Sequence, residues 1–486
     1  MLRLAALLFS PLFLFVTSCS GGTVSPQVSQ STVVHRSPGT VGDNVIHSFS
    51  STGGMIPMGT VAAQLTGPST YTFYGTTPYA SNGKGTIFKY NYASFSTIFT
   101  FPSDSSKGAE PIGGVIVDSS GALYGTTFES DNTTTYAAGG GTVYKLTPSG
   151  STYTYSNLHT FAPRTSDGDH PSAALIEDSS GNLYGTTDSG GIYSPYCDSS
   201  SGTGNEVIGC GTVFELSHSG SGYLYNVIYR FAGATDGQLS AGGLLLDSSG
   251  NLYGATAIGG SHCEVSFGVG CGTVYKLQPT HAILWSKTTL YNFAGGSDGS
   301  FPTSALVASS SGNLFGTTQR GGAHDCGTIF KLHPNGGGGY TESVLHSFSC
   351  GVGSISGLSL GEGELWGAHE KSSGSCCGAI FETDPSSGST SEAYAFQGHP
   401  ADDGAGPVAP PYTGYGGFYP TGSLLVVPSS QTFLYGVTLT GGSHSGCSDT
   451  GSGSGYYAGC GTFYSFAISS GPKSGKERSR KAAFLP

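Results

Sequence analysis

The ten residues DSSGNLYGTT, at positions 178–187, decide the fold, because close copies of them return along the whole chain. The core of the motif is an aromatic residue followed by glycine and two small residues. It occurs seven times, with the aromatic residue at Tyr74, Tyr124, Tyr184, Tyr253, Phe315, Trp366 and Tyr435. A motif that recurs at a spacing of 50–69 residues predicts one supersecondary unit repeated in an array.

Two further motifs have the same copy number. A Gly-Thr-Val-Phe-like segment begins at Gly85, Gly141, Gly211, Gly272, Gly327, Gly378 and Gly461. A short segment that ends in phenylalanine finishes at Phe49, Phe101, Phe161, Phe231, Phe293, Phe348 and Phe396. Three independent motifs with seven copies each predict seven repeats.

Each repeat contains four strand-like segments, and in one copy these are residues 174–176, 182–186, 212–216 and 225–231. They are rich in β-branched and aromatic residues and are bounded by Gly, Asp and Ser, which is typical of an antiparallel meander. Four antiparallel strands per repeat form a propeller blade. We therefore expect an all-β protein, a seven-bladed β-propeller.

The order of the motifs at the two ends predicts how the ring closes. The phenylalanine-ended segment appears first at residues 45–49, before any other motif, and is missing after Gly461. The N-terminal strand can therefore complete the blade that begins near Ser423, in a velcro closure that leaves no free sheet edge. An open solenoid would carry atypical capping repeats instead.

The repeated Tyr-Gly-Thr-Thr and Gly-Thr-Val-Phe-Lys-Leu units resemble the Gloeo/Verruco (GloVer) tandem repeat of bacterial surface proteins with assorted anchors. The resemblance covers about residues 45–466, and the copies at Trp366 and Gly461 are degenerate. It implies an exported location, and it supplies neither an activity nor catalytic residues.

The N-terminus predicts export. Arg3 precedes an apolar run over residues 4–16, which is too short to span a bilayer. The following Val-Thr-Ser-Cys resembles a bacterial lipobox with Cys19 as the lipidated residue. We expect a lipoprotein signal peptide at 1–18, a flexible tether at 19–42, the propeller at 43–470 and a basic disordered tail at 471–486. The chain would then be lipid-anchored in the cell envelope, with Ser20 favouring the outer membrane.

Composition limits the partners. The chain has a net charge of −12, and the basic tail accounts for +4, so the remainder is close to −16. An acidic body argues against nucleic acid as a partner. The lipid is the expected contact with the membrane. We expect a monomer without cofactors.

Loop length and cysteines point to one face. The gap between the second and third strands varies from 8 residues after Thr77 to 24 after Thr187. Variable loops commonly carry binding, so this loop face is the candidate functional surface. Export permits disulfides, and loop positions predict the pairs Cys197–Cys210, Cys263–Cys271, Cys326–Cys350 and Cys447–Cys460. Cys376 and Cys377 remain as a vicinal pair or free thiols, with Cys350–Cys376 as an alternative.

The candidate ligand-binding residues lie on the same face. They are the loop histidines His262, His324, His369 and His444, and the aspartates of the blade connections, chiefly Asp167, Asp236 and Asp298. The aspartates also suit tight turns, and the histidine and cysteine spacings do not form a metal-site motif, so we expect no metal.

No catalytic motif is present, and we assign no catalytic residue. We therefore expect a surface binding or scaffold protein that uses the variable-loop face to hold a glycan or an envelope protein. The alternative is an extracytoplasmic lyase or hydrolase with its site at the channel mouth, since propellers host both classes of function.

Overall fold

The computed structural model describes fifteen stretches of the chain. They are residues 43–81, 83–130, 140–163, 165–193, 197, 209–220, 222–240, 242–261, 270–281, 284–350, 355–370, 378–396, 423–428, 432–439 and 461–468. The expected signal peptide, tether and basic tail lie outside these residues. In the described stretches no helix is long and apolar enough to cross a membrane.

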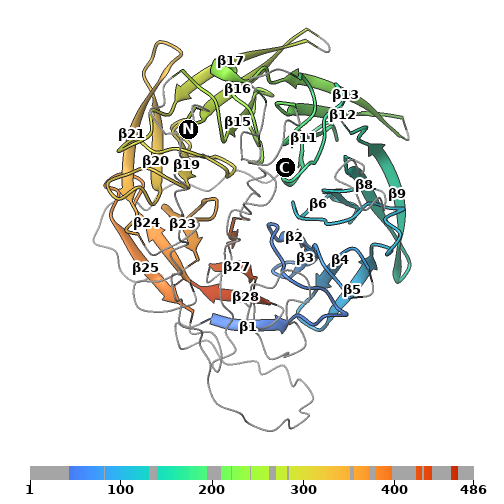
Figure 1. Ribbon diagram of the computed structural model, residues 1–486. Helices are drawn as coiled ribbons and strands as arrows, with labels where there is room; N and C mark the ends of the chain where they lie inside the picture. Colours follow the sequence, from blue (N-terminus) through green and yellow to red (C-terminus); the bar gives the residue numbers. More distant parts are fainter. Residues whose placement is uncertain are drawn as a thin grey trace, which may run out of the picture.

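The fold is a seven-bladed propeller, as the motifs predict, with each blade an antiparallel sheet of four strands (Figure 1). Six blades follow the chain in order. The first three comprise β2 (Ala62–Leu65), β3 (Tyr71–Thr77), β4 (Thr86–Tyr90) and β5 (Phe95–Thr100); β6 (Val115–Val117), β7 (Leu123–Thr127), β8 (Thr142–Ser149) and β9 (Thr152–Thr160); and β10 (Ile176–Glu177), β11 (Leu183–Thr187), β12 (Thr212–Ser219) and β13 (Gly222–Arg230).

The next three blades repeat this order. They comprise β14 (Leu245–Leu246), β15 (Leu252–Thr256), β16 (Thr273–His281) and β17 (Leu284–Asn292); β18 (Val307–Ala308), β19 (Leu314–Thr318), β20 (Thr328–Pro334) and β21 (Tyr340–Ser347); and β22 (Ser359–Gly361), β23 (Glu364–His369), β24 (Ala379–Thr383) and β25 (Thr390–Ala395). The third and fourth strands of several blades are longer than their motifs, because they continue into an outer hairpin.

The seventh blade closes the ring with the N-terminal strand. Its strands are β26 (Leu425–Val427), β27 (Phe433–Thr438), β28 (Thr462–Ala467) and β1 (Asp43–Ser48). Val45 pairs with Tyr464, and the register shifts between Val45 and His47. The same register shift occurs in the pairing of the third and fourth strands in the other six blades. Strand β1 therefore completes the seventh blade as a regular fourth strand.

The glycine of the aromatic-Gly motif is required by packing. In every blade it pairs across the sheet with an aromatic residue of the third strand, as Gly254 does with Tyr275. A Cβ atom on Gly254 would lie 2.4 Å from the Tyr275 hydroxyl, and the other six glycines have equivalent contacts of 2.3–2.5 Å. The end of the aromatic ring thus lies over the glycine, and Tyr275 is fully buried.

The threonines of the two motifs form a repeated clamp at the loop end of each blade. The last threonine of the second strand and the first of the third are hydrogen-bonded through their hydroxyls, at 2.7–2.9 Å, in six blades. In the sixth blade His369 and Ala379 occupy these places. The hydroxyls of the clamp threonines are therefore satisfied within six of the seven sheets, which a buried hydroxyl requires.

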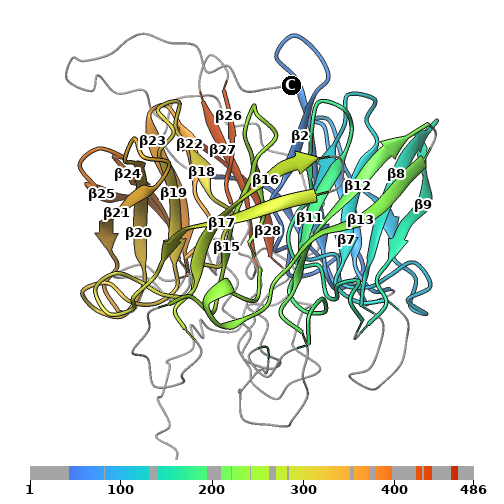
Figure 2. The ribbon, with the colours of Figure 1, turned by 90° about the horizontal axis from the view of Figure 1, so that it is seen from above.

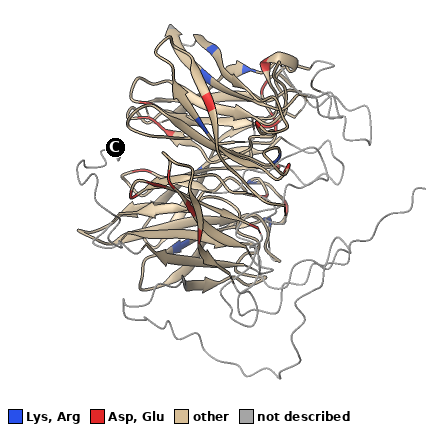
Figure 3. Cartoon of the chain, turned by 90° about the vertical axis from the view of Figure 1, so that its left-hand side faces the viewer, with Lys and Arg blue, Asp and Glu red and all other residues tan. Residues whose placement is uncertain are grey.

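The two faces of the disc are built differently (Figure 2). One face carries the Asp-Ser-Ser-Gly turns and the outer hairpins. There Asp178 Oδ1 accepts the amides of Ser180 and Asn182, at 2.8 and 2.9 Å, so this aspartate is a turn residue as expected. The opposite face carries the blade connections and the ends of the second strands, and we call it the loop face. Charged residues are scattered sparsely over the described blades (Figure 3).

Candidate functional site

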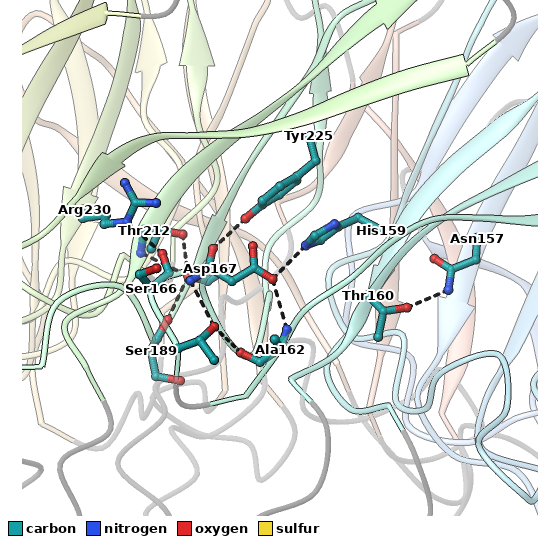
Figure 4. Close-up of polar contacts among 12 residues, drawn as sticks. Asn157, His159, Thr160, Ala162, Ser166, Asp167, Ser189, Thr212, Tyr225 and Arg230 are labelled. Carbon is teal, nitrogen blue, oxygen red and sulfur yellow. Dashed lines mark hydrogen bonds and ion pairs between the residues drawn. The ribbon is translucent and has the colours of Figure 1, made fainter.

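The connection aspartates of the loop face close the turns that follow the fourth strands. Asp167 Oδ2 accepts hydrogen bonds from His159 Nε2 and the amide of Ala162, both at 3.0 Å. Tyr225 donates to the Asp167 carbonyl at 2.6 Å (Figure 4). Although burial opposes ionisation, these hydrogen bonds hold the pKa of Asp167 below its usual value. The carboxylate therefore holds the turn closed, and we call this set of hydrogen bonds the clasp.

The same clasp recurs in the next two blades. One oxygen of Asp236 accepts the Tyr229 hydroxyl at 2.7 Å, and the other accepts the amide of Ala232 at 2.8 Å. Asp298 makes the equivalent bonds at 2.8 and 2.6 Å, to Tyr291 and to the amide of Ala294. Each aspartate thus closes the turn after the fourth strand of a different blade.

The four candidate histidines differ in where they lie. His262 and His444 lie outside the described residues. His324 is exposed, next to the third-strand cysteine of its blade. The prediction that His369 belongs to the exposed binding face is wrong, since its side chain is only 2% exposed and stacks on Phe381 inside the sixth blade. It fills the place of a clamp threonine, so its side chain is buried at the loop end of the blade. No group of potential metal ligands occurs within the described residues.

Two of the expected disulfides are present in the structure. Cys197 is bonded to Cys210 and Cys326 to Cys350, with Cα–Cα distances of 4.9 and 5.2 Å. Cys271 is also disulfide-bonded. Its expected partner is Cys263, which lies outside the described residues. The expected pair Cys447–Cys460 and the two cysteines Cys376 and Cys377 also lie outside them.

A position on the loop face keeps one backbone conformation while its side chain changes from blade to blade. It lies five or six residues before the innermost strand of its blade, with φ between 57° and 59°, and we call it the ring position. Its residues are Ile56, Glu110, His170, Leu239 and Phe301. Positive φ is uncommon for residues with a side chain and strains the backbone.

Hydrogen bonds fix the ring position between two blades. The amide of Glu110 donates to the Lys84 carbonyl of the preceding blade at 2.9 Å, and the Glu110 carbonyl accepts the amide of Phe128 at 3.0 Å. Equivalent pairs of bonds hold the ring position in the next three blades. The scaffold thus presents different side chains from equivalent anchored places.

Two neighbouring ring positions carry ionisable side chains, and other charged groups gather around them. We call this group the charged cluster, and it consists of Lys84, Glu110, Glu129, Asp169, His170 and Asp188. His170 Nδ1 lies 3.0 Å from Asp169 Oδ1 and 3.2 Å from Ser189 Oγ. The imidazole also packs on Phe128, with a centroid distance of 4.6 Å.

Burial and mutual charge shift the ionisation of the charged cluster. Burial, followed by the charge of Glu129, raises the pKa of Glu110 to about 7. Burial raises the pKa of Asp188 to about 7, against a 2.7 Å hydrogen bond from Ser172. Burial opposes the charge of His170, but Asp169 raises the pKa of this imidazole. Groups with such shifts are typical of functional sites.

The repeat pattern does not reveal the charged cluster, because aspartates that recur from repeat to repeat are mainly turn residues. A usable signal was the residue before the proline in the blade connection, where Ile56-Pro57, Glu110-Pro111 and His170-Pro171 differ in chemistry. At a repeated structural position, a side chain that changes is the better guide to binding.

Comparisons with known proteins agree with the repeat pattern. The model of the Gloeobacter/Verrucomicrobia repeat family matches residues 13–203 and 196–446. No curated protein gives a significant match. A putative 6-phosphogluconolactonase from Bacteroides uniformis is 13% identical, with a TM-score of 0.44, over 76% of this chain and 89% of that chain. The periplasmic gluconolactonase of Pseudomonas aeruginosa is 14% identical, with a TM-score of 0.43, over 77% and 93%. These likenesses carry no argument about activity.

Proposed function

The chain belongs to the Gloeobacter/Verrucomicrobia repeat family, and from that premise we propose that it is an exported binding or scaffold protein of the bacterial cell surface. It is held in the envelope, in this proposal, by a lipid on Cys19. The loop face of the propeller binds a glycan or an envelope protein. The disulfides support the exported location, because such bonds persist in oxidising compartments.

One observation carries the proposal. The ring position has the same φ in five blades, yet it presents an isoleucine, a glutamate, a histidine, a leucine and a phenylalanine. Packing alone would favour the same side chain in each blade, as it does for the glycines and the clamp threonines. A rigid frame with interchangeable side chains is what recognition of an asymmetric ligand requires.

The alternative, a lyase or hydrolase, has one observation in its favour. Asp169 lies against Nδ1 of His170, and a carboxylate in this place orients an imidazole so that Nε2 can accept a proton. The connection aspartates do not add to such a site, because they close turns. We therefore place binding first.

A glycan-array screen tests the proposal. The sample is the chain from Ser20 to Pro486, with His170→Gln as the loop-face variant. Leu284→Ser is the matched control, because Leu284 is 63% exposed and belongs to an outer hairpin on the face opposite the loop face. We expect binding without released product, weakened by His170→Gln and unaffected by Leu284→Ser. Turnover of a bound glycan would refute the proposal, and absence of binding to any glycan would refute the glycan as its ligand and leave an envelope protein.

A further inference from the structure

The charged cluster has an excess of negative groups drawn from three blades. Lys84 precedes β4, Glu110 and Glu129 flank the first two strands of the second blade, and Asp169, His170 and Asp188 belong to the third. Glu110 senses the charges of Glu129, Lys84 and His170. His170 in turn senses Asp169, Asp188 and Glu129. The groups therefore form one electrostatic unit with four carboxyls and two basic side chains.

A buried carboxyl oxygen in this unit has unused hydrogen-bonding capacity. Asp188 is 3% exposed, and its Oδ1 accepts the hydroxyl of Ser172. Its Oδ2 accepts no hydrogen bond from any residue in the described part of the chain. An unsatisfied buried oxygen costs about 1–3 kcal/mol, and a donor supplied by a ligand would recover part of that.

The chemistry of the site selects the ligand. The excess of carboxyls favours a cation, and the described residues offer no metal-binding group, so an organic ammonium fits. Phe128, beside His170, adds an apolar surface of the kind that packs on the C–H groups of a sugar ring. We propose that the charged cluster, centred on Glu110, His170 and Asp188, binds a saccharide that carries a protonated amino group. This inference rests on the proposed binding function and names its ligand class.

Binding is coupled to protons at this site. The ligand ammonium favours the ionised forms of Glu110 and Asp188, both of which hold a proton at low pH because their pKa values are near 7. A sugar amine gains its own proton between pH 8 and pH 6, which raises the affinity, while each proton displaced from the protein lowers it about tenfold over the same range. A protonated His170 repels the ammonium, which acts in the same direction, while Lys84 remains charged throughout this range.

Calorimetric titration with two matched probes tests the inference. The chain from Ser20 to Pro486 is titrated with the tetrasaccharide of chitosan, which bears free amines, and with that of chitin, whose amines are acetylated. At pH 7 we expect the chitosan probe to bind at least about tenfold more tightly than the chitin probe. Equal binding of both probes would overturn the inference.

Variants locate the site. Glu110→Gln replaces a carboxyl that is neutral at low pH with an isosteric amide, so the fold is retained, and we expect about a tenfold loss of affinity for the chitosan probe. Asp104→Asn is the control, because it removes one charge from the same connection at an exposed turn. An unchanged affinity in Glu110→Gln, or an equal loss in Asp104→Asn, would place binding elsewhere.

Two further outcomes separate this inference from the proposed function. Binding of neutral glycans on the array without binding of the chitosan probe would refute only the ammonium site. Tighter binding of a tetralysine peptide than of the chitosan probe would also refute the saccharide assignment, and it would favour a protein partner for the loop face.

Discussion

The neighbouring fourth and fifth blades differ by a reversal of charge at one contact, and this permits a sharp stability prediction. In the fourth blade Lys287 reaches the connection of the preceding blade, with Nζ 2.8 Å from Asp236 Oδ1. Glu342 occupies the same place in the fifth blade, six residues before the strand-ending phenylalanine. It lies near Asp298, and burial followed by this charge raises the pKa of Glu342 to about 8.

We predict that Glu342→Lys stabilises the propeller. At pH 7 the wild-type glutamate is mostly protonated, while the introduced lysine would pair with Asp298 as Lys287 pairs with Asp236. The Lys287 side chain is 5% exposed and that of Asp236 is 24% exposed, so the site is partly screened. After the cost of desolvation we expect a net gain of about 1–2 kcal/mol in the free energy of unfolding.

The pH dependence provides a second readout. Because the pKa of Glu342 is raised on folding, its contribution to stability is complete below about pH 4.5 and is lost as the pH rises through 8. The lysine variant lacks this loss. The stability advantage of the variant should therefore increase from pH 5 to pH 9.

Thermal and urea unfolding of the chain from Ser20 to Pro486 measure both effects. We expect Glu342→Lys to raise the thermal midpoint by about 2–4 °C at pH 7. The reciprocal variant Lys287→Glu should lower the free energy of unfolding by about 3–5 kcal/mol, because it leaves a buried acidic pair. A destabilised Glu342→Lys, or an advantage that shrinks at high pH, would refute the reasoning.

Two further predictions concern packing and protons. Gly254→Ala should cost about 2–4 kcal/mol in urea unfolding, because its methyl group would lie 2.4 Å from the hydroxyl oxygen of the buried Tyr275. Gly222→Ala, whose Cβ would meet nothing within 4 Å, should change stability by less than about 0.5 kcal/mol, and similar losses in both variants would contradict the packing argument. The raised pKa values of Glu110 and Asp188 are near 7, so their stabilising contribution is lost as the pH rises from about 4 to 7. The thermal midpoint should therefore fall by about 5 °C between pH 5 and pH 8, and the double variant Glu110→Gln/Asp188→Asn should show a smaller fall; an equal fall would contradict this assignment.

Much of the fold could be predicted because the repeats encode contacts within a blade. Every repeat has a glycine equivalent to Gly254 and an aromatic residue equivalent to Tyr275, because the aromatic ring fits only where the paired residue has no side chain. The early appearance of the segment that ends at Phe49 predicted the closure. Two disulfides followed from the predicted proximity of loop ends.

The candidate site could not be predicted in the same way, because its groups meet only through contacts between blades. Glu110 and His170 belong to different repeats, and their neighbours Glu129 and Asp188 follow second strands. Sequence reasoning placed His369 on the loop surface, whereas the buried clamp of the sixth blade contains it. The clasp between His159 and Asp167 also depends on a turn geometry that spacing alone does not specify.

Closure of the ring by β1 is the central claim, and an engineered disulfide tests it most directly. Asn44 pairs with Ser465 across β1 and β28, so the double variant Asn44→Cys/Ser465→Cys places two thiols at a cross-strand pair. The off-register control is Val45→Cys/Ser465→Cys, whose side chains point to opposite faces. Mass spectrometry of unreduced peptides should find the cross-link in the first variant, accompanied by a higher thermal midpoint. Absence of that cross-link, or equal cross-linking in the control, would contradict a ring shut by the start of the chain.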